Sequence, residues 1–286
     1  MNDLGVHALV FSGGTSPKDI ELIVDRAKNA RYDLIELSLH DSENLDLSHA
    51  RRVLEKIDLE VVCSRGLAFD ADVSSDDLEI VKKGSKLLQD SLEITHALGG
   101  AHFSGALYSA LGKYSSPLTS SGYANVVSVL RELSHEAYKR NMTLGIEVCN
   151  RYETNVVNTA HDALNLIDDI GNDNVLLHLD TYHMNIEESD IVSPVLMAKD
   201  RLGYVHIGEN HRGYLGSGHI DFASFFRALS QVNYQGKITF ESFSSAVVSA
   251  KLSNDLAIWR NLWDDGPALA AHARQFMLTM LEANNV

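Results

Sequence analysis

VLLHLDT, residues 175–181, is a short apolar run that ends in an acidic side chain, Asp180. Three further runs repeat this pattern and carry Glu147, His206 and Glu241 near their ends: TLGIEVC (143–149), LGYVHIGE (202–209) and KITFESF (237–243). Short, continuously apolar runs are typical of parallel strands that helices cover on both faces. The pattern therefore predicts four successive parallel strands, each of which delivers one polar group at its carboxyl end.

The same kind of run occurs four more times in the first half of the chain, at residues 5–12, 34–39, 59–64 and 101–107. Segments with helical periodicity separate the runs, so strand and helix alternate along the chain. Eight such units in 286 residues fit a (β/α)8 barrel, which usually takes about 250 residues. We therefore predict an α/β fold, with a single TIM barrel domain over residues 1–286.

Two helix starts can be predicted from capping residues. Ser16 followed by Pro17 indicates an N-cap with proline in the first turn. Ser74 with Asp77 indicates a capping box in front of an apolar face that begins at Leu78. A further helix is expected over residues 123–141.

The segment Ser242 to Pro267, after the eighth run, is longer than an ordinary loop of this fold and contains Trp259 and Trp263. Insertions of this kind often cover the mouth of a barrel or form a subunit contact. We expect one of these two roles here.

Composition narrows the class of protein. The formal net charge of −15 would repel a phosphate backbone, so nucleic acid is not an expected partner. No apolar run approaches the roughly 20 residues that span a membrane, and no signal peptide is evident. Cys63 and Cys149 both fall in predicted buried strands, which favours reduced thiols. We expect a cytoplasmic protein without a membrane partner.

The four polar residues at the strand ends form a candidate metal site. Active sites of (β/α)8 barrels lie at the carboxyl ends of the strands. Each acid alone would serve equally well as a helix N-cap or an ion-pair partner. Three carboxylates and one imidazole together suit Mn²⁺, Mg²⁺ or Co²⁺ with positions open to substrate, whereas structural zinc favours thiolates. The predicted metal ligands are Glu147, Asp180, His206 and Glu241.

A second polar residue follows three of these ligands at short spacing. Glu153 lies six residues after Glu147, His183 three after Asp180, and Arg212 six after His206. The repetition predicts a substrate-binding rim, although any one of these side chains could also be a solvated loop residue. His178 lies two residues before Asp180 on the same strand face and could reach the pocket from the layer below.

Several strings of this sequence resemble the D-tagatose 3-epimerase and D-psicose (D-allulose) 3-epimerase family, a branch of the xylose isomerase-like barrels. They are GIEVCNRYETN, HLDTYHMNIEE, YVHIGENHRGYLGSGHIDF, ITFESF and LAIWR. The resemblance implies the same four metal ligands, with Mn²⁺ or Co²⁺ as the usual metal. It also implies acid/base roles for Glu147 and Glu241, contacts from Glu153, His183 and Arg212 to O1 and O2 of a ketose, and a homodimer or homotetramer.

The chain departs from that family at two apolar positions. The family commonly has a tryptophan after the fourth strand, where this chain reads GALYSALGKY, and aromatic residues along the first strand, where His7, Ala8 and Val10 stand. These positions shape the far end of the pocket. The resemblance therefore supports chemistry at C3 and leaves the choice of ketose open.

The implied reaction inverts the carbon beside a carbonyl, so a proton must leave one face and return to the other. We hypothesise that Glu147 and Glu241 do this across C3, with the cation as Lewis acid and a cis-enediolate between the two steps. Other readings stay open: a sugar isomerase such as a hydroxypyruvate isomerase, an inosose dehydratase, a phosphosugar epimerase, a metal-dependent endonuclease and a non-catalytic sugar-binding barrel.

Overall fold

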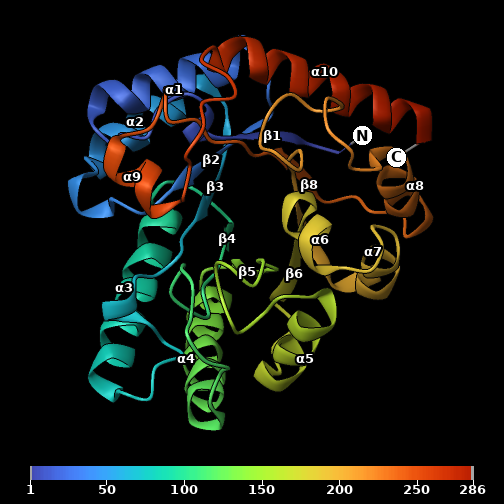
Figure 1. The fold of residues 1–286 in the computed structure, drawn as a ribbon. Coiled ribbons are helices and arrows are strands. Elements are labelled where there is room, and N and C mark those ends of the chain that lie inside the picture. The colour runs from blue at the N-terminus through green and yellow to red at the C-terminus, as the bar shows by residue number, and fades with distance from the viewer. Residues whose placement is uncertain (1, 285–286) are drawn as a thin grey trace.

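Eight parallel strands close into a barrel in chain order within residues 2–284, the part of the protein that the computed structural model describes (Figure 1). The first strand pairs with the second and with the eighth, which completes the closure. The predicted TIM barrel is confirmed. The strands are β1 Leu4–His7, β2 Leu34–Ser38, β3 Glu60–Ser64, β4 His102–Ser104, β5 Thr143–Glu147, β6 Val175–Asp180, β7 Leu202–Ile207 and β8 Lys237–Phe240.

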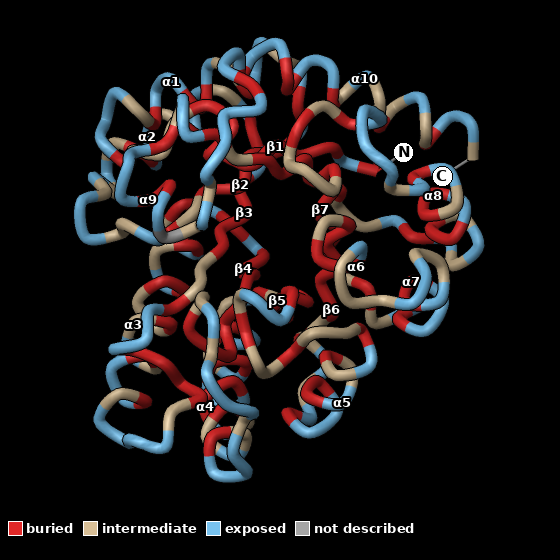
Figure 2. The backbone as a smooth tube through the Cα atoms, viewed as in Figure 1, coloured by how far each residue is buried: buried red, intermediate tan, exposed pale blue. Residues whose placement is uncertain are grey.

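Helices surround the barrel, and buried residues concentrate on the strands and on the helix faces turned toward them (Figure 2). Near the end of the chain, α10 packs against α8 and beside β1. The helices are α1 Pro17–Asn29, α2 Leu47–Ile57, α3 Leu78–Ala97, α4 Ser120–Lys139, α5 Ala160–Ile170, α6 Thr181–Glu187, α7 Ser193–Ala198, α8 Phe222–Gln231, α9 Ala250–Asp255 and α10 Gly266–Asn284. No helix in this described part is long and apolar enough to cross a membrane.

The first predicted helix start is confirmed. The Ser16 side chain accepts a hydrogen bond from the Asp19 N–H, and the Asp19 side chain accepts one from the Ser16 N–H. Pro17 then occupies the first turn, where its missing N–H costs nothing. The apolar face of α1 is buried as expected, through Ile20, Ile23, Val24 and Ala27.

The predicted capping box at Ser74 is wrong. Asp77 is the N-cap of α3, and its side chain accepts from the Glu79 N–H at 2.9 Å. Ser74 lies three residues before this cap, outside the helix, and its N–H and hydroxyl donate to Asp72 at 2.8 and 2.7 Å. Leu78, predicted to begin the apolar face, is 66% exposed.

Each strand is shorter than the apolar run that predicted it, and β1 and β4 are shortened most. β1 ends at His7 and continues as a 3-10 turn over Ala8–Val10. β4 ends at Ser104 because Gly105 has a φ of 116°, a conformation that favours glycine. A Cβ at Gly105 would also collide with the Arg65 carbonyl. Apolar runs predict where a strand passes through the core, and backbone turns at the rim decide where it stops.

The insertion after β8 contains α9 and packs on the carboxyl side of the barrel. Its Val248 and Leu252 form a small apolar cluster with Leu9, just after β1. Trp263 is buried and donates its indole N–H to Ser242 Oγ at 2.9 Å, whereas Trp259 is 74% exposed. Residues 256–260 and Leu262 line a cavity at the barrel mouth, so the predicted role as a partial cover agrees with the structure.

Candidate active site

The four predicted metal ligands converge at the carboxyl end of the barrel. Glu147 and Asp180 are the last residues of β5 and β6. His206 pairs directly with Asp180 across the β6–β7 ladder, and Glu241 follows β8. One ligand atom from each of the four lies within 4.8 Å of every other. Four residues spread over 95 positions thus form one cluster.

The donor atoms of this cluster suit a divalent cation. His206 Nδ1 lies 3.5 Å from Glu147 Oε1, 3.5 Å from Glu241 Oε2 and 3.9 Å from Asp180 Oδ2. This nitrogen is buried and has no hydrogen-bond partner among the described residues. Buried carboxylates repel one another and require a compensating positive charge. A hard cation would supply that charge and would give the orphaned nitrogen a partner.

Glu36, in the middle of β2, was not among the residues predicted for the site. Its Oε2 lies 2.7 Å from His206 Nε2 and accepts a 2.7 Å hydrogen bond from the Tyr204 hydroxyl. A carboxylate on the far nitrogen of a metal-binding histidine fixes its tautomer and ring orientation. Here the bond to Glu36 aims Nδ1 at the carboxylates. An acid within the buried run LIELS was the available signal, because such an acid is rare unless it has a partner.

The surroundings of the two glutamates shift their pKa values in opposite directions. Burial raises the pKa of Glu147 above its ordinary value. Burial would also raise the pKa of Glu241, but attraction to His206 and Arg212 outweighs it and holds that pKa well below the ordinary value. Two carboxyl groups whose environments separate their pKa values are typical of an acid/base pair.

His206, which lies 3.5 Å from both Glu147 and Glu241, is subject to the same charges. Burial acts to lower the pKa of His206, and the attraction of Glu36 and Glu241 outweighs it, so the pKa lies well above the ordinary value. For Glu36, burial acts upward, and the charge of and hydrogen bond to His206 lower the pKa to about 2. Glu36 is therefore ionised at neutral pH and can hold the His206 ring.

Arg212 lies at the centre of the predicted substrate rim. Its Nη1 is 2.8 Å from Glu241 Oε2 and 3.3 Å from Asp180 Oδ2. The guanidinium stacks 3.9 Å over the Tyr182 ring, and residue 212 has a left-handed φ of 59°. Contacts on two sides hold the planar group rigidly, so its remaining N–H groups are oriented toward the mouth before a ligand arrives.

Asn150 joins the other two rim residues and was also missed from the sequence. Its backbone N–H donates to His183 Nδ1 at 3.1 Å, so the ring proton of neutral His183 lies on Nε2. That Nε2 lies 3.6 Å from Asp180 Oδ2. The Asn150 side chain donates to Glu153 Oε1 at 2.8 Å. The structure therefore links Glu153 to His183 through Asn150, and it places His183 and Arg212 against Asp180 of the four-residue cluster. Their contacts with a substrate stay a prediction.

A cavity of about 230 Å³ opens beside these rim residues. Glu153, Tyr182 and Arg212 line its inner side, and Phe243 and residues 256–260 line the rest. The volume lies below the roughly 300–1,000 Å³ of pockets that take drug-sized ligands. The cavity suits a small polar molecule that presents hydroxyl groups to the rim.

The two positions that depart from the expected aromatic pattern have defined partners. Tyr108, in the GALY segment, is fully buried and donates to the Glu147 carbonyl at 2.6 Å. His7 Nε2 lies 3.6 Å from Glu36 Oε1 and 3.9 Å from Glu241 Oε1. Both side chains support the glutamates rather than line the cavity.

Comparison with known proteins assigns the class. A family model described as the xylose isomerase-like TIM barrel matches residues 24–279, so the chain belongs to that family. Within it, the chain is 47% identical over 275 residues to an L-ribulose 3-epimerase of Methylomonas sp. (strain DH-1), with 96% of each chain covered. It is 44% identical over 280 residues to a ketose 3-epimerase of Arthrobacter globiformis, covering 98% of this chain and 97% of the relative.

Solved structures agree with these relatives. A D-allulose 3-epimerase from Methylomonas sp. in complex with D-allulose superposes with a TM-score of 0.96 at 46% identity, covering 98% of this chain and 97% of that one. A structure of L-ribulose 3-epimerase gives the same TM-score at 39% identity, covering 100% of this chain and 96% of that one. The predicted resemblance to ketose 3-epimerases is confirmed.

Proposed function

We propose that this protein is a metal-dependent ketose 3-epimerase that interconverts C3 epimers of free ketoses. One observation carries the proposal. Glu147 and Glu241, from β5 and β8, each bring a carboxylate oxygen to one cluster with Asp180 and His206, in which the ligand atoms lie within 4.8 Å of one another. Relatives at 47% and 44% identity are named as L-ribulose and ketose 3-epimerases.

The residues divide the work as follows. Glu147 and Glu241 would flank C3, one removing its proton and the other returning a proton to the opposite face. Arg212 and His183 would donate to O1 and O2 of the ketose, and Glu153 would accept from the C1 hydroxyl. In this arrangement they would place C3 between the glutamates and would keep the sugar from shifting by one carbon. Epimerisation at C3, rather than transfer between C1 and C2, follows from that placement.

The proposed cofactor is a divalent cation held by Glu147, Asp180, His206 and Glu241. The three carboxylates favour Mn²⁺, with Co²⁺ or Mg²⁺ as alternatives. When bound, the cation supplies Lewis-acid polarisation of the sugar oxygens, which makes the C3 proton more acidic.

A phosphosugar epimerase is the less favoured alternative. Of the two arginines that line the cavity, Arg260 lies exposed in the insertion, and Arg212 already contacts the carboxylates of Glu241 and Asp180. These carboxylates would also repel a phosphate dianion. We therefore propose an unphosphorylated ketose as substrate, of the L-ribulose, D-allulose, D-fructose or D-tagatose type.

The test is a substrate panel. The protein, stripped of metal with a chelator, would be incubated with free and phosphorylated ketopentoses and ketohexoses, with and without Mn²⁺. We expect C3 epimers of free ketoses as products, formed only with added metal. Aldose products, or turnover restricted to phosphorylated sugars, would contradict the proposal.

We further propose that the enzyme acts in the cytoplasm as a homodimer or homotetramer. The exposed side chain of Trp259, in the insertion, and the near absence of cysteine support these proposals. Light scattering after size-exclusion chromatography would give the oligomeric state. A strictly monomeric active enzyme would contradict it.

A further inference from the structure

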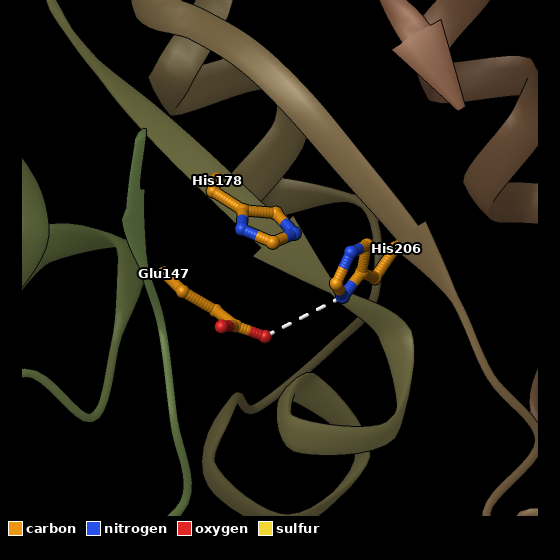
Figure 3. A group of neighbouring side chains, drawn as sticks. All are labelled: Glu147, His178 and His206. Atoms are coloured by element: carbon orange, nitrogen blue, oxygen red, sulfur yellow. Dashed lines mark ion pairs between the residues drawn. The ribbon is translucent and has the colours of Figure 1, made fainter. Parts of the chain in front are cut away.

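His178 lies one layer below the metal cluster and has no part in the proposed reaction. It precedes Asp180 by two residues on β6, so its side chain points to the same face about 6–7 Å lower along the strand. The ring is fully buried, with its centroid 4.1 Å from that of His206 and 4.8 Å from that of Tyr204. Figure 3 shows it beside His206 and facing Glu147.

One nitrogen of His178 has no partner. Nδ1 lies 2.8 Å from Ser104 Oγ, and that hydroxyl also lies 3.3 Å from the Gly145 carbonyl, to which it can only donate. Both contacts are satisfied together when Nδ1 carries the ring proton and donates to Ser104. Nε2 is then a bare lone pair, and it is buried without a hydrogen bond among the described residues. A buried polar atom without a partner requires a reason.

The bare nitrogen has two other ligand atoms within reach. One atom each from Glu147, His178 and His206 lie within 4.8 Å of one another. His206 Nδ1 also lacks a hydrogen-bond partner, and it is 3.5 Å from Glu147 Oε1 (dashed line in Figure 3). Each imidazole thus has one nitrogen without a partner, and one ligand atom of each ring lies within 4.8 Å of the other and of Glu147, in a group that includes the layer below the four-ligand cluster.

These three residues form a different kind of ligand set. The upper cluster has three carboxylates and one imidazole, whereas the lower set has two imidazoles and one carboxylate. Imidazole suits zinc, copper and nickel, and carboxylates suit manganese and magnesium. Two histidines with one glutamate are a known three-ligand zinc set.

We propose that Glu147, His178 and His206 form a second, deeper cation position that selects Zn²⁺ over Mn²⁺. The two positions share Glu147 and His206, so a single ion occupies one or the other. An ion in the deeper position leaves Asp180 and Glu241 without a metal contact. Zn²⁺ would then exclude Mn²⁺ from the upper cluster. The inference rests on the proposed metal cluster, and it is independent of which carbon of the sugar reacts.

The experiment compares two single variants with two metals. Metal-free wild type, His178→Gln and Asp180→Asn would be titrated with Zn²⁺ against a chromophoric chelator and with Mn²⁺ by electron paramagnetic resonance. We expect His178→Gln to weaken the binding of Zn²⁺ about tenfold or more and the binding of Mn²⁺ less than about threefold. Asp180→Asn should do the reverse. Equal losses of both metals in His178→Gln, or unchanged Zn²⁺ affinity, would overturn the proposal.

X-ray absorption at the zinc edge of the wild type decides the matter even if a variant fails to fold. A spectrum that shows two imidazole ligands on the zinc ion would support the deeper position. A spectrum that shows one imidazole with carboxylates would overturn it. A wild type that binds Zn²⁺ through two imidazoles yet fails to bind Mn²⁺ would contradict the proposed function while supporting this inference. The two proposals can therefore fail separately.

Discussion

The two halves of the barrel contribute differently to the site. β5 to β8 deliver the four candidate metal ligands, and the loops that follow them deliver the substrate rim. β1 to β4 deliver buried partners: His7 and Glu36 contact Glu241 and His206, and Ser104 contacts His178 one layer below. β5 to β8 thus supply the candidate reacting groups, and β1 to β4 supply side chains that orient them. The comparison predicts that changes in the first half of the barrel act through metal binding alone, whereas changes in the second half also lower turnover directly.

The largest effect is expected from the paired glutamates. Glu147→Gln or Glu241→Gln keeps the side-chain shape but removes an acid/base group, which is worth about 10²–10⁴-fold in rate. We expect kcat on a ketose to fall by at least that factor in saturating Mn²⁺, with circular dichroism unchanged. Epimerisation near the wild-type rate in either variant would end the claim that β5 and β8 carry the proton transfer.

Arg212→Lys should give the next largest effect. Lysine retains the charge but cannot reproduce the stack on Tyr182 or the fixed N–H directions. Hydrogen bonds to charged groups contribute about 1.5–3 kcal/mol, so kcat/KM should fall about 10- to 150-fold. Arg151→Lys is the matched control, because Arg151 pairs with Glu187 at the surface. Similar losses in both variants would show that Arg212 has no special place in the rim.

Glu36→Gln tests the supporting half directly. The variant loses the charge that holds the His206 ring, and outer-shell changes of this kind weaken metal binding about 10- to 100-fold. The Mn²⁺ dissociation constant measured by electron paramagnetic resonance should rise by that factor. Glu60→Gln is the control, since Glu60 pairs with Lys237 at the start of β3. If Glu36→Gln bound Mn²⁺ as tightly as this control, the claim that β1 to β4 position the metal ligands would be contradicted.

The smallest effect is expected from the two tryptophans of the insertion. Trp263→Phe removes the indole N–H that contacts the Arg212 carbonyl and Ser242 Oγ. At about 0.5–1.5 kcal/mol, this loss should lower the melting temperature by a few degrees. Trp259→Phe should leave it unchanged, because Trp259 is exposed. Equal shifts would show that the insertion does not anchor the Arg212 backbone.

The same division explains what the sequence could predict. Asp180 and Glu241 stand at the ends of apolar runs, where the barrel fold itself assigns a functional position. Glu36 lies inside a run, and its role depends on a contact with His206, 170 residues away. Asn150 acts through its backbone N–H on His183, 33 residues away, and through its side chain on Glu153, and no side-chain motif encodes the backbone contact. Ser74 is not the cap because α3 begins three residues later, where the Asp77 side chain accepts from the Glu79 N–H.

The measurement that tests the central claim most directly is proton NMR of a ketose incubated with the Mn²⁺-loaded protein in D₂O. If Glu147 and Glu241 exchange the proton of C3, deuterium should replace hydrogen at C3 as the epimer forms, and the C1 protons should remain. Deuterium at C1, or epimer formed without any deuterium at C3, would contradict the account.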